Sequence, residues 1–376
     1  MQYLKKTDNP EEMIQIGRRI AEDKKDLYSP SMMEKMMRGV EGHIPDASAE
    51  EKEQMVYRAI YDYWVYGANV DEEFYLKFYE KTDDEKKNYV VDALRFVYLK
   101  RLNSGGGKEI RELLQDKYKL YQRLKPYYQR DLIQVSSLSD LSSFSSFVQK
   151  HPVFVVKPSD YYYGIGVHKV DLKQYANDPQ LALEEILKEG DDIRKSHPSR
   201  ANTMVLEELI IQDSALSLIH PESVNTIRAT AVRGKDGKIH VYHPWIKVGA
   251  NGTFVATAVL GGFDAEIDSE SGVVISDGYQ ESGRIISIHP NTGIQIKGFK
   301  IPRWEELIKI VNELMSLLPE YGYIGWDMAL TSKGWCVVEG NYSGEFIFQM
   351  INGRGYRKEF EDLIGWKFDK EFWWQG

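Results

Sequence analysis

An apolar hairpin near the C-terminus constrains the fold more than any other stretch of this 376-residue chain. Residues 323–330 and 335–341 are two apolar runs of strand length, and a short glycine-containing turn separates them. The first run carries Asp327, and the second carries Glu339 and Asn341. Glu339 and Asn341 are two positions apart, so on a strand they point to the same face. Asp327, on the preceding strand, could lie beside them.

These three side chains offer two carboxylates and an amide oxygen. Hard oxygen ligands suit Mg²⁺, which commonly shares its coordination shell with substrate phosphates, and Mn²⁺ is an alternative ion. The pattern therefore predicts a metal site formed by Asp327, Glu339 and Asn341. The alternative interpretation is a polar hairpin edge that faces water, and it holds unless the chain also binds phosphate upstream.

Composition indicates a globular protein, with 42% apolar and 28% charged residues. The length is too great for one ordinary core and favours roughly two or three subdomains. A net charge of −9 argues against a nucleic-acid partner. The single cysteine, Cys336, excludes an internal disulfide framework and fits a reducing cytoplasm, where we expect the protein. No run approaches the ~20 apolar residues that a membrane span needs.

Helical spacing of apolar residues dominates residues 1–104. The expected helices there are 11–27, 48–66, 71–79 and 84–102. Gly105, Gly106 and Gly107 form the clearest linker of the chain. Gly107 and Lys108 do not form a phosphate-binding P-loop, because the upstream glycine spacing and the following Ser or Thr are missing.

After this linker, antiparallel strands mix with packing helices, which is an α+β pattern. The expected helices are 109–124, 138–147, 180–195, 302–318, 346–352 and 357–364. The expected strands before the hairpin are 132–135, 153–156, 167–172, 203–211, 223–233, 238–248 and 253–260.

Two lysines are candidates for contact with phosphate. Lys157 ends the apolar strand 153–156 and faces a loop that contains Gly164 and Gly166. A lysine can pair with phosphate oxygens as a point charge, and glycines let a backbone close over them. Lys117, on the helix 109–124, is the second candidate. The alternatives are a solvated strand-edge lysine and a solvent-facing helix lysine.

Three further charged positions interrupt apolar strands. Glu207 and Glu208 lie inside an apolar run and must face opposite sides of a strand, so one could border a purine or ribose pocket. Arg228 lies on the strand 223–233, where it forms either a salt bridge or a clamp on phosphate or carboxylate. Lys247 precedes a glycine-containing loop and is a candidate for contact with an anionic acceptor group. The alternative is that Lys247 is a surface lysine without a role in binding.

In this order, the motifs resemble those of the ATP-grasp superfamily over about residues 109–345. The late motif GWDMALTSKGWCVVEGNYSGEF is the most specific, and it follows VFVVKPSDYYYGIGV, MVLEELI and ESVNTIRATAVR. The combination is most similar to the sugar-transfer-associated ATP-grasp proteins. The resemblance implies an α+β ATP-grasp fold, in which two α+β subdomains clamp ATP, preceded by an N-terminal helical region. It implies the following domains: 1–104 helical region, 105–150 linker helix and start of the ATP-grasp region, 151–215 small subdomain with a lid, and 216–376 large subdomain with the metal site.

The resemblance also implies a role for each candidate residue. Lys117 and Lys157 would hold the ATP phosphates beneath a lid, residues 160–166, that includes Gly164 and Gly166. Glu207, Glu208 and Leu209 would border the adenine. Arg228 and Lys157 would be catalytic, near the transferred phosphate. Asp327, Glu339 and Asn341 would be the Mg²⁺ ligands.

The function that the resemblance implies is an ATP- and Mg²⁺-dependent carboxylate–amine ligase that acts through an acyl phosphate. Its partners would be a small-molecule or glycan-linked carboxylate and an amine acceptor, in polysaccharide or surface-glycan biosynthesis. One alternative is a kinase on the same scaffold that phosphorylates a small-molecule or sugar hydroxyl. The other is a non-catalytic nucleotide-binding regulator, which the presence of every predicted phosphate and metal residue disfavours.

Overall fold

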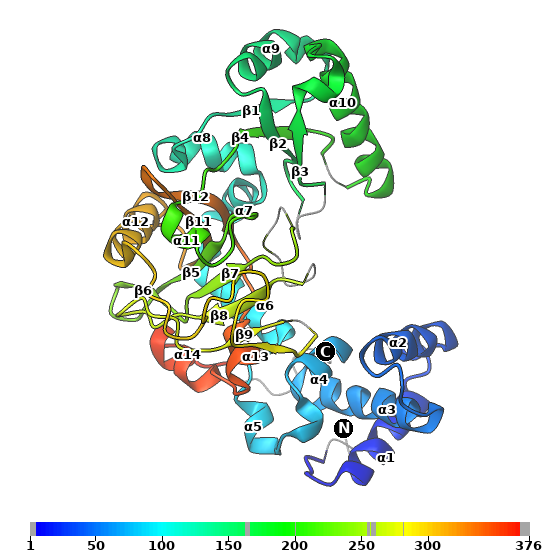
Figure 1. The fold of residues 1–376 in the computed structure, drawn as a ribbon. Coiled ribbons are helices and arrows are strands. Elements are labelled where there is room, and N and C mark those ends of the chain that lie inside the picture. The colour runs from blue at the N-terminus through cyan, green and yellow to red at the C-terminus, as the bar shows by residue number, and fades with distance from the viewer. Residues whose placement is uncertain are drawn as a thin grey trace. The chain divides into compact units, whose positions relative to one another are not determined.

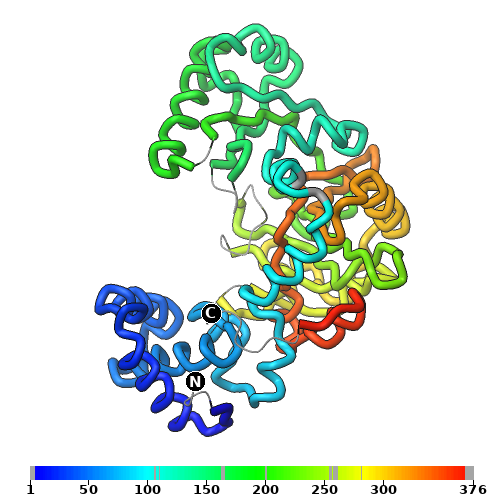
Figure 2. Tube along the Cα trace, turned by 180° about the vertical axis from the view of Figure 1, so that it is seen from behind, coloured from blue at the N-terminus to red at the C-terminus, as the bar shows by residue number. Residues whose placement is uncertain are grey.

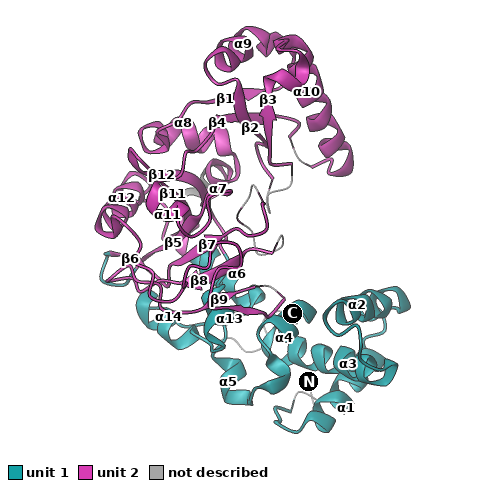
Figure 3. Cartoon of the chain, viewed as in Figure 1, with its two compact units in different colours: residues 1–101, 234–238, 345–376 teal, residues 102–233, 239–344 magenta. Residues whose placement is uncertain are grey.

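The computed structural model describes residues 5–161, 166–199, 201–253, 256, 261–280 and 282–368. The chain forms two compact units, which Figure 3 distinguishes by colour. Unit 1 contains residues 1–101, 234–238 and 345–376, and unit 2 contains residues 102–233 and 239–344. Within the described ranges, every strand belongs to unit 2.

The smaller sheet of unit 2 has four antiparallel strands in the order β1-β4-β2-β3. Their bounds are Leu132–Val135 (β1), Met204–Glu208 (β4), Val153–Pro158 (β2) and His168–Asp171 (β3). Helices α9 (Leu141–Lys150) and α10 (Pro179–Ser196) pack on one face, as Figure 1 shows, and bury Phe144 and Ile186 against Phe154. β2 and β3 pair with each other, as consecutive strands of the chain.

The larger sheet has eight strands in the order β10-β9-β8-β7-β5-β11-β12, with β6 beside β5. Their bounds are Ile285–Ile286 (β10), Gly278–Tyr279 (β9), Phe263–Glu266 (β8), Trp245–Val248 (β7), Thr226–Arg233 (β5), Tyr323–Thr331 (β11), Gly334–Asn341 (β12) and Ile239–Val241 (β6). One face is apolar and packs against α8 (Lys117–Tyr128) and α12 (Trp304–Leu317). The short helices α7 (Gly107–Gln115) and α11 (Ser214–Ser217) complete unit 2.

Several sequence-based boundaries of unit 2 are wrong. The expected helix 109–124 is two helices, because Asp116 caps a new helix by accepting hydrogen bonds from the N–H groups of Tyr118 and Lys119. The second of them, α8, does not stop before Pro126 but kinks at Leu124 and continues. The expected strand 203–211 ends at residue 208, and 238–248 is divided into β6 and β7. Most of the expected strand 253–260 lies outside the described residues.

Unit 1 is helical within its described residues. Its helices are α1 (Pro10–Asp23), α2 (Pro30–His43), α3 (Ala49–Tyr66), α4 (Val70–Tyr75), α5 (Asp83–Lys87), α6 (Asp92–Leu102), α13 (Phe348–Asn352) and α14 (Arg357–Ile364). A capping box of Ser48 and Glu51 opens α3. Gly17 sits inside α1 because a Cβ there would lie 1.9 Å from the carbonyl oxygen of Tyr57, so the glycine lets α1 lie against α3.

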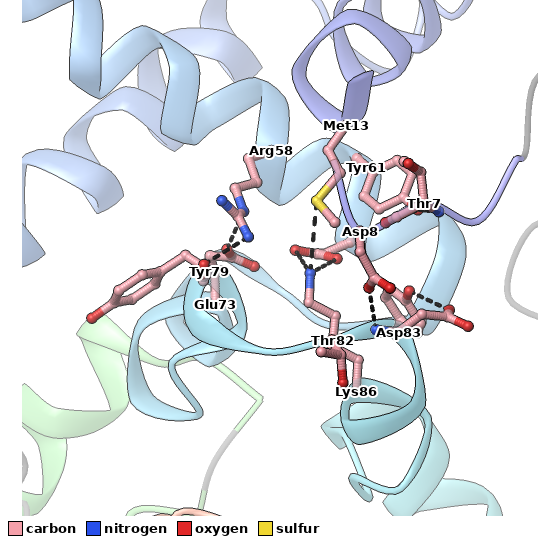
Figure 4. A network of polar contacts seen from close by, with 12 residues as sticks. Thr7, Asp8, Met13, Arg58, Tyr61, Glu73, Tyr79, Thr82, Asp83 and Lys86 are labelled. Atoms are coloured by element: carbon pink, nitrogen blue, oxygen red, sulfur yellow. Dashed lines mark hydrogen bonds and ion pairs between the residues drawn. The ribbon is translucent and has the colours of Figure 1, made fainter. Parts of the chain in front are cut away.

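A buried network of charged side chains joins the helices of unit 1 (Figure 4). The Lys86 ammonium donates to both oxygens of Asp62, at 2.8 and 3.0 Å, and neither side chain is exposed. Glu73 is also fully buried, and its carboxylate lies 3.4 Å from the guanidinium of Arg58. Burial, and the neighbouring carboxylate of Asp62, raise the pKa of Glu73 well above its usual range. The Lys86–Asp62 ion pair and the neighbouring Glu73 thus connect α5, α3 and α4.

The C-terminal segment packs on the N-terminal helices within the same unit. Gln349 exchanges two hydrogen bonds with the backbone of Val90, at 2.8 and 3.1 Å. The ring of Phe360 lies 5.5 Å from that of Tyr98. Figure 2 shows the red C-terminal stretch beside the cyan helices from behind. These contacts give the N-terminal helices and the C-terminal segment a shared core. The assignment of residues 1–104 as a separate region stays a prediction.

A chain that begins at Glu109 is therefore expected to aggregate. Removing the N-terminal helices would expose Phe360 and the other apolar side chains that the C-terminal segment buries in unit 1. Size-exclusion chromatography of the truncated chain should show soluble aggregates or little soluble material. A monodisperse truncated chain would contradict a shared core.

Candidate functional site

The hairpin residues lie on one polar face of the larger sheet. In the register of β11, Asp327 is directly opposite Glu339 of β12 and Arg228 of β5, while Gly325 is opposite Asn341. Directly opposite residues of antiparallel strands share a face. The expectation that Asp327 lies beside Glu339 and Asn341 is thus confirmed, and the alternating residues between them face the apolar core.

A β-bulge produces this arrangement. From the turn, the pairing runs in step until Met328 faces Val337, and then shifts so that Asp327 faces Glu339. Without the extra residue in β12, Asp327 would face Val338, and the two carboxylates would point to opposite sides of the sheet. The bulge is therefore the local feature that brings the acidic side chains together.

Asp327 is the most strongly contacted member of this face. Its carboxylate accepts from Arg228 Nε at 2.6 Å and Nη2 at 3.0 Å, from Lys247 Nζ at 3.4 Å and from Asn341 Nδ2 at 3.4 Å. Burial raises the pKa of Asp327, but the Arg228 guanidinium and the Lys247 ammonium outweigh it and lower that pKa to about 2. Asp327 is therefore ionised at neutral pH. Lys247 thus lies beside the hairpin residues, and its contact with an anionic acceptor group stays a prediction.

Arg228 is held by its neighbours rather than left to solvent. Its guanidinium carbon lies 5.4 Å from the centre of the Trp245 ring, which faces it in β7. A Cβ on Gly325 would lie 3.3 Å from Arg228 Cδ, so this glycine makes room for the arginine. Of the two alternatives for Arg228, the structure contains the salt bridge, with Asp327 as the partner. Contact of Arg228 with a phosphate stays a prediction.

The negative charge of Glu339, unlike that of Asp327, has no cationic partner among the described residues. Its side chain is half-buried, and within the described part of the chain it makes no hydrogen bond or ion pair. Asn341 donates to the carbonyl oxygen of Gly325 at 3.1 Å through Nδ2, which leaves its side-chain oxygen available as an acceptor. Two carboxylates and one amide oxygen on one face are a donor set that fits a hard divalent cation.

The ion pair of Asp327 should appear in the acid stability of the protein. Its pKa in the folded state lies below the ordinary value near 4, so its contribution is present above about pH 4 and is lost as the pH falls toward 2. We expect Asp327→Asn to lower the free energy of unfolding by about 2 kcal/mol at neutral pH. Denaturant unfolding of both proteins should show this difference shrinking as the pH falls below 4. A difference that is independent of pH would contradict the assignment.

A second cluster lies on β2 and β4, the two central strands of the smaller sheet. Lys157, at the end of β2, forms an ion pair with Glu207 of β4, and both are buried. Arg130 donates to the same carboxylate through Nε at 3.0 Å and Nη2 at 2.9 Å. Burial lowers the pKa of Lys157, as do the charges of Arg130 and Lys117, while Glu207 opposes them. Lys117 is buried as well and donates to the carbonyl oxygen of Tyr161 at 2.5 Å.

Charge in this second cluster does not balance. Two buried cations, Lys157 and Arg130, pair with the one carboxylate of Glu207, and the charge of a third buried cation, Lys117, acts on Lys157. Buried charges are costly unless they are paired. The excess of positive charge in this cluster therefore fits an anionic ligand.

Arg130 links the two clusters. Its Nη1 donates at 2.7 Å to the carbonyl oxygen of Val337, two residues before Glu339 in β12, while its other nitrogens hold Glu207. Burial raises the pKa of the neighbouring Tyr128, and the carboxylates of Glu207 and Glu339 add to that effect. The excess cations and the metal-type donor set are thus neighbours. Arg130 was not among the residues predicted from the sequence, where its only signal was a charge two positions before a strand.

The remaining predicted residues have mixed outcomes. Glu208 points away from Glu207, as expected, and accepts a hydrogen bond from the Asp131 N–H at 3.1 Å. Leu209 follows β4 and is partly exposed. Gly166 has a φ of +72°, and a Cβ there would meet Pro158 at 2.9 Å, so a glycine is required. Gly164 and most of the predicted lid lie outside the described residues.

Comparison with known families decides the fold. The sequence model of the sugar-transfer associated ATP-grasp family matches residues 94–363. The chain belongs to this family. The match includes both clusters, and it confirms the predicted ATP-grasp fold and α+β class. No curated protein matches the chain. None of the described helices has the length and apolar character that crossing a membrane requires.

Similar folds among solved structures are distant in sequence. D-alanyl-alanine synthetase A from Vibrio cholerae O1 biovar eltor is 14% identical, with a TM-score of 0.40, over 70% of this chain and 63% of that one. N5-carboxyaminoimidazole ribonucleotide synthetase from Thermotoga maritima is 16% identical, with a TM-score of 0.35, over 67% and 50%. The biotin carboxylase domain of Hydrogenobacter thermophilus 2-oxoglutarate carboxylase, in complex with MgADP, ADP and bicarbonate, is 12% identical, with a TM-score of 0.42, over 70% and 48%. The chain thus spans less than two thirds of each of these proteins.

Proposed function

We propose that this ATP-grasp chain is an ATP- and Mg²⁺-dependent carboxylate–amine ligase. The observation that carries the proposal is the adjacency of two complementary clusters, which Arg130 joins. One has more buried cations than carboxylates, and the other offers only oxygen ligands. Excess cations are what binds nucleotide phosphates, and oxygen ligands are what binds a divalent ion that accompanies those phosphates.

Each residue has a role in this proposal. Lys117 and Lys157 bind the phosphates, Gly166 ends the lid together with Gly164, and Glu207, Glu208 and Leu209 border the adenine. Asp327, Glu339 and Asn341 hold Mg²⁺, or Mn²⁺ as a substitute. The ion, when bound, would offset the charge of the phosphate oxygens. Arg228 is poised beside Asp327 to stabilise charge on the transferred phosphoryl group once the ion shares that carboxylate.

The proposed reaction has two steps. A substrate carboxylate attacks the γ-phosphorus of ATP, a new P–O bond forms, and the bond to ADP breaks to leave an acyl phosphate. An amine then attacks the acyl carbon, a C–N bond forms, and phosphate leaves as the amine loses a proton. The contribution of this chain is to position the reactants and to neutralise charge through Lys157 and Arg228.

The description of the family supports a glycan-related substrate. Its members are termed sugar-transfer associated, which favours a glycan-linked carboxylate or amine in polysaccharide or surface-glycan biosynthesis. A kinase on the same scaffold, acting on a small-molecule or sugar hydroxyl, is the alternative that the test below separates. A non-catalytic regulator is disfavoured, because the phosphate-type cations and the metal-type oxygens are both intact.

The requirement for acceptors tests the proposal. ADP release should be measured with panels of carboxylic acids, including sugar acids, and of amines, separately and together, with the products identified by mass spectrometry. A ligase needs both acceptors for sustained turnover and yields an amide. Sustained ADP release with one acceptor, together with a phosphorylated product, would replace the ligase by the kinase.

A further inference from the structure

Unit 1 contains a cavity that is separate from the candidate site. Its volume is about 970 Å³, and residues from 65–94 and 353–368 line most of it. Every lining residue belongs to unit 1, whereas the phosphate and metal clusters belong to unit 2. The proposed ATP chemistry therefore assigns no task to this cavity.

The lining is basic although the chain is acidic. Seven lining residues are lysine or arginine and three are acidic, in a chain whose net charge is −9. A local reversal of sign in a concave site attracts anions. The basic residues besides the paired Lys86 are Lys6, Lys81, Lys87, Arg354, Arg357 and Lys358.

Some of these cations already have counter-charges and others do not. Lys87 pairs with Asp83, and Arg357 donates to Glu361 at 3.1 Å. Arg354 and Lys358 are exposed, and no carboxylate of the described residues lies within ion-pair distance of either. Lys81 donates to the carbonyl oxygen of Gly353 at 3.1 Å and forms no ion pair with any described residue. The cavity therefore holds positive charge that a ligand could neutralise.

The backbone that carries these cations is fixed. Asn88 donates to the Gly355 carbonyl at 2.8 Å, and its own oxygens accept from the N–H groups of Arg357 at 2.7 Å and Lys358 at 3.1 Å. A Cβ on Gly355 would lie 2.2 Å from the Asn88 carbonyl oxygen, so only glycine allows this approach. The site is thus pre-organised rather than a loose gathering of surface lysines.

Aromatic rings accompany the cations. Tyr66, Tyr89 and Phe368 also line the cavity, and the Lys81 ammonium lies 5.5 Å from the centre of the Tyr89 ring. The buried hydroxyl of Tyr89 has no hydrogen-bond partner in the described structure. Buried tyrosine hydroxyls usually find a partner, so this one is a candidate for contact with a ligand oxygen.

We propose that this cavity binds an anionic sugar, meaning a sugar ring that carries a carboxylate or a phosphate. Arg354, Lys358 and Lys81 pair with the anion, because lysine and arginine bind both groups. The partly exposed ring of Phe368 packs against the sugar ring, and the orphaned Tyr89 hydroxyl is the polar contact beneath it. The ligand is either a free acidic sugar or an acidic residue of a glycan, and the site is independent of ATP binding.

Titration of the full chain tests the inference. The ligands are glucuronic acid, glucose 1-phosphate and a glucuronate-containing oligosaccharide, with glucose and inorganic phosphate as controls, and heats or chemical shifts are measured. At least one anionic sugar should bind saturably, and glucose and phosphate should bind much more weakly. Tighter binding of the oligosaccharide than of the monosaccharides would identify the ligand as an acidic residue of a glycan. Tighter binding of the monosaccharides would identify it as a free acidic sugar.

Charge reversal provides the matched comparison. The double variant Arg354→Glu/Lys358→Glu should weaken anionic-sugar binding about tenfold or more. Lys100→Glu, an exposed lysine of α6 that does not line the cavity, should leave binding within about twofold. ATP affinity should stay unchanged in both, which separates this site from the proposed ligase site. Absence of saturable binding, phosphate binding as tightly as glucose 1-phosphate, or equal losses in the two variants would overturn the proposal.

Discussion

Replacing Glu339 by glutamine is expected to lower ADP release by about a hundredfold or more while ATP still binds. The change keeps the shape of the side chain and removes its charge. The carboxylate of Asp327 already forms ion pairs with Arg228 and Lys247, whereas that of Glu339 has no cationic partner among the described residues. Glu339 therefore supplies the negative charge that a divalent ion most needs. A steady-state assay of ADP release, with calorimetry of ATP binding, measures both effects.

The matched control for Glu339 is Glu320→Gln. Glu320 is an exposed glutamate just before β11, so the same change of charge should leave turnover within about twofold. If Glu339→Gln also stays within a few-fold of the parent, the hairpin is a solvated edge. The metal assignment would then be lost.

A Lys86→Met variant should destabilise the folded protein by about 3–5 kcal/mol. The substitution leaves the carboxylate of Asp62 fully buried without its ammonium partner, next to Glu73. The two remaining acidic groups would then lie together in the core of unit 1. Denaturant unfolding at neutral pH measures the loss.

Lys87 provides the comparison, because it is the next residue and pairs with Asp83 at a half-exposed position. Lys87→Met should cost less than about 1 kcal/mol. The double variant Asp62→Asn/Lys86→Met should recover part of the loss, since it removes the stranded charge. Equal costs for Lys86→Met and Lys87→Met would show that burial of the pair contributes nothing.

Much of the fold follows from local pattern. The hairpin of β11 and β12 could be predicted because two apolar runs of strand length lie on either side of a glycine-containing turn. The side-by-side position of Asp327 and Glu339 has a less visible cause, the bulge between Asp327 and Met328. A bulge changes the register by one residue and leaves little trace in the apolar pattern. The expectation was therefore confirmed through a feature that the sequence did not reveal.

Long-range contacts account for what the sequence could not supply. Arg130 becomes a site residue only because the chain brings Glu207 and Val337, 77 and 207 positions away, to the same guanidinium. Periodicity carries no information about such separations. In the same way, the ion pair of Lys86 and Asp62, and the contact of residues 345–368 with the N-terminal helices, depend on tertiary packing.

Calorimetric titration of Mg-ATP into the parent chain and into Lys157→Ala tests the central claim most directly. Glu207 keeps Arg130 as a partner when Lys157 is removed, so the variant should retain its fold, as circular dichroism would show. The account predicts saturable binding to the parent and an affinity lower by on the order of a hundredfold in the variant, the scale of losing a buried charge partner. An unchanged affinity in the folded variant would contradict the placement of the nucleotide phosphates at Lys157.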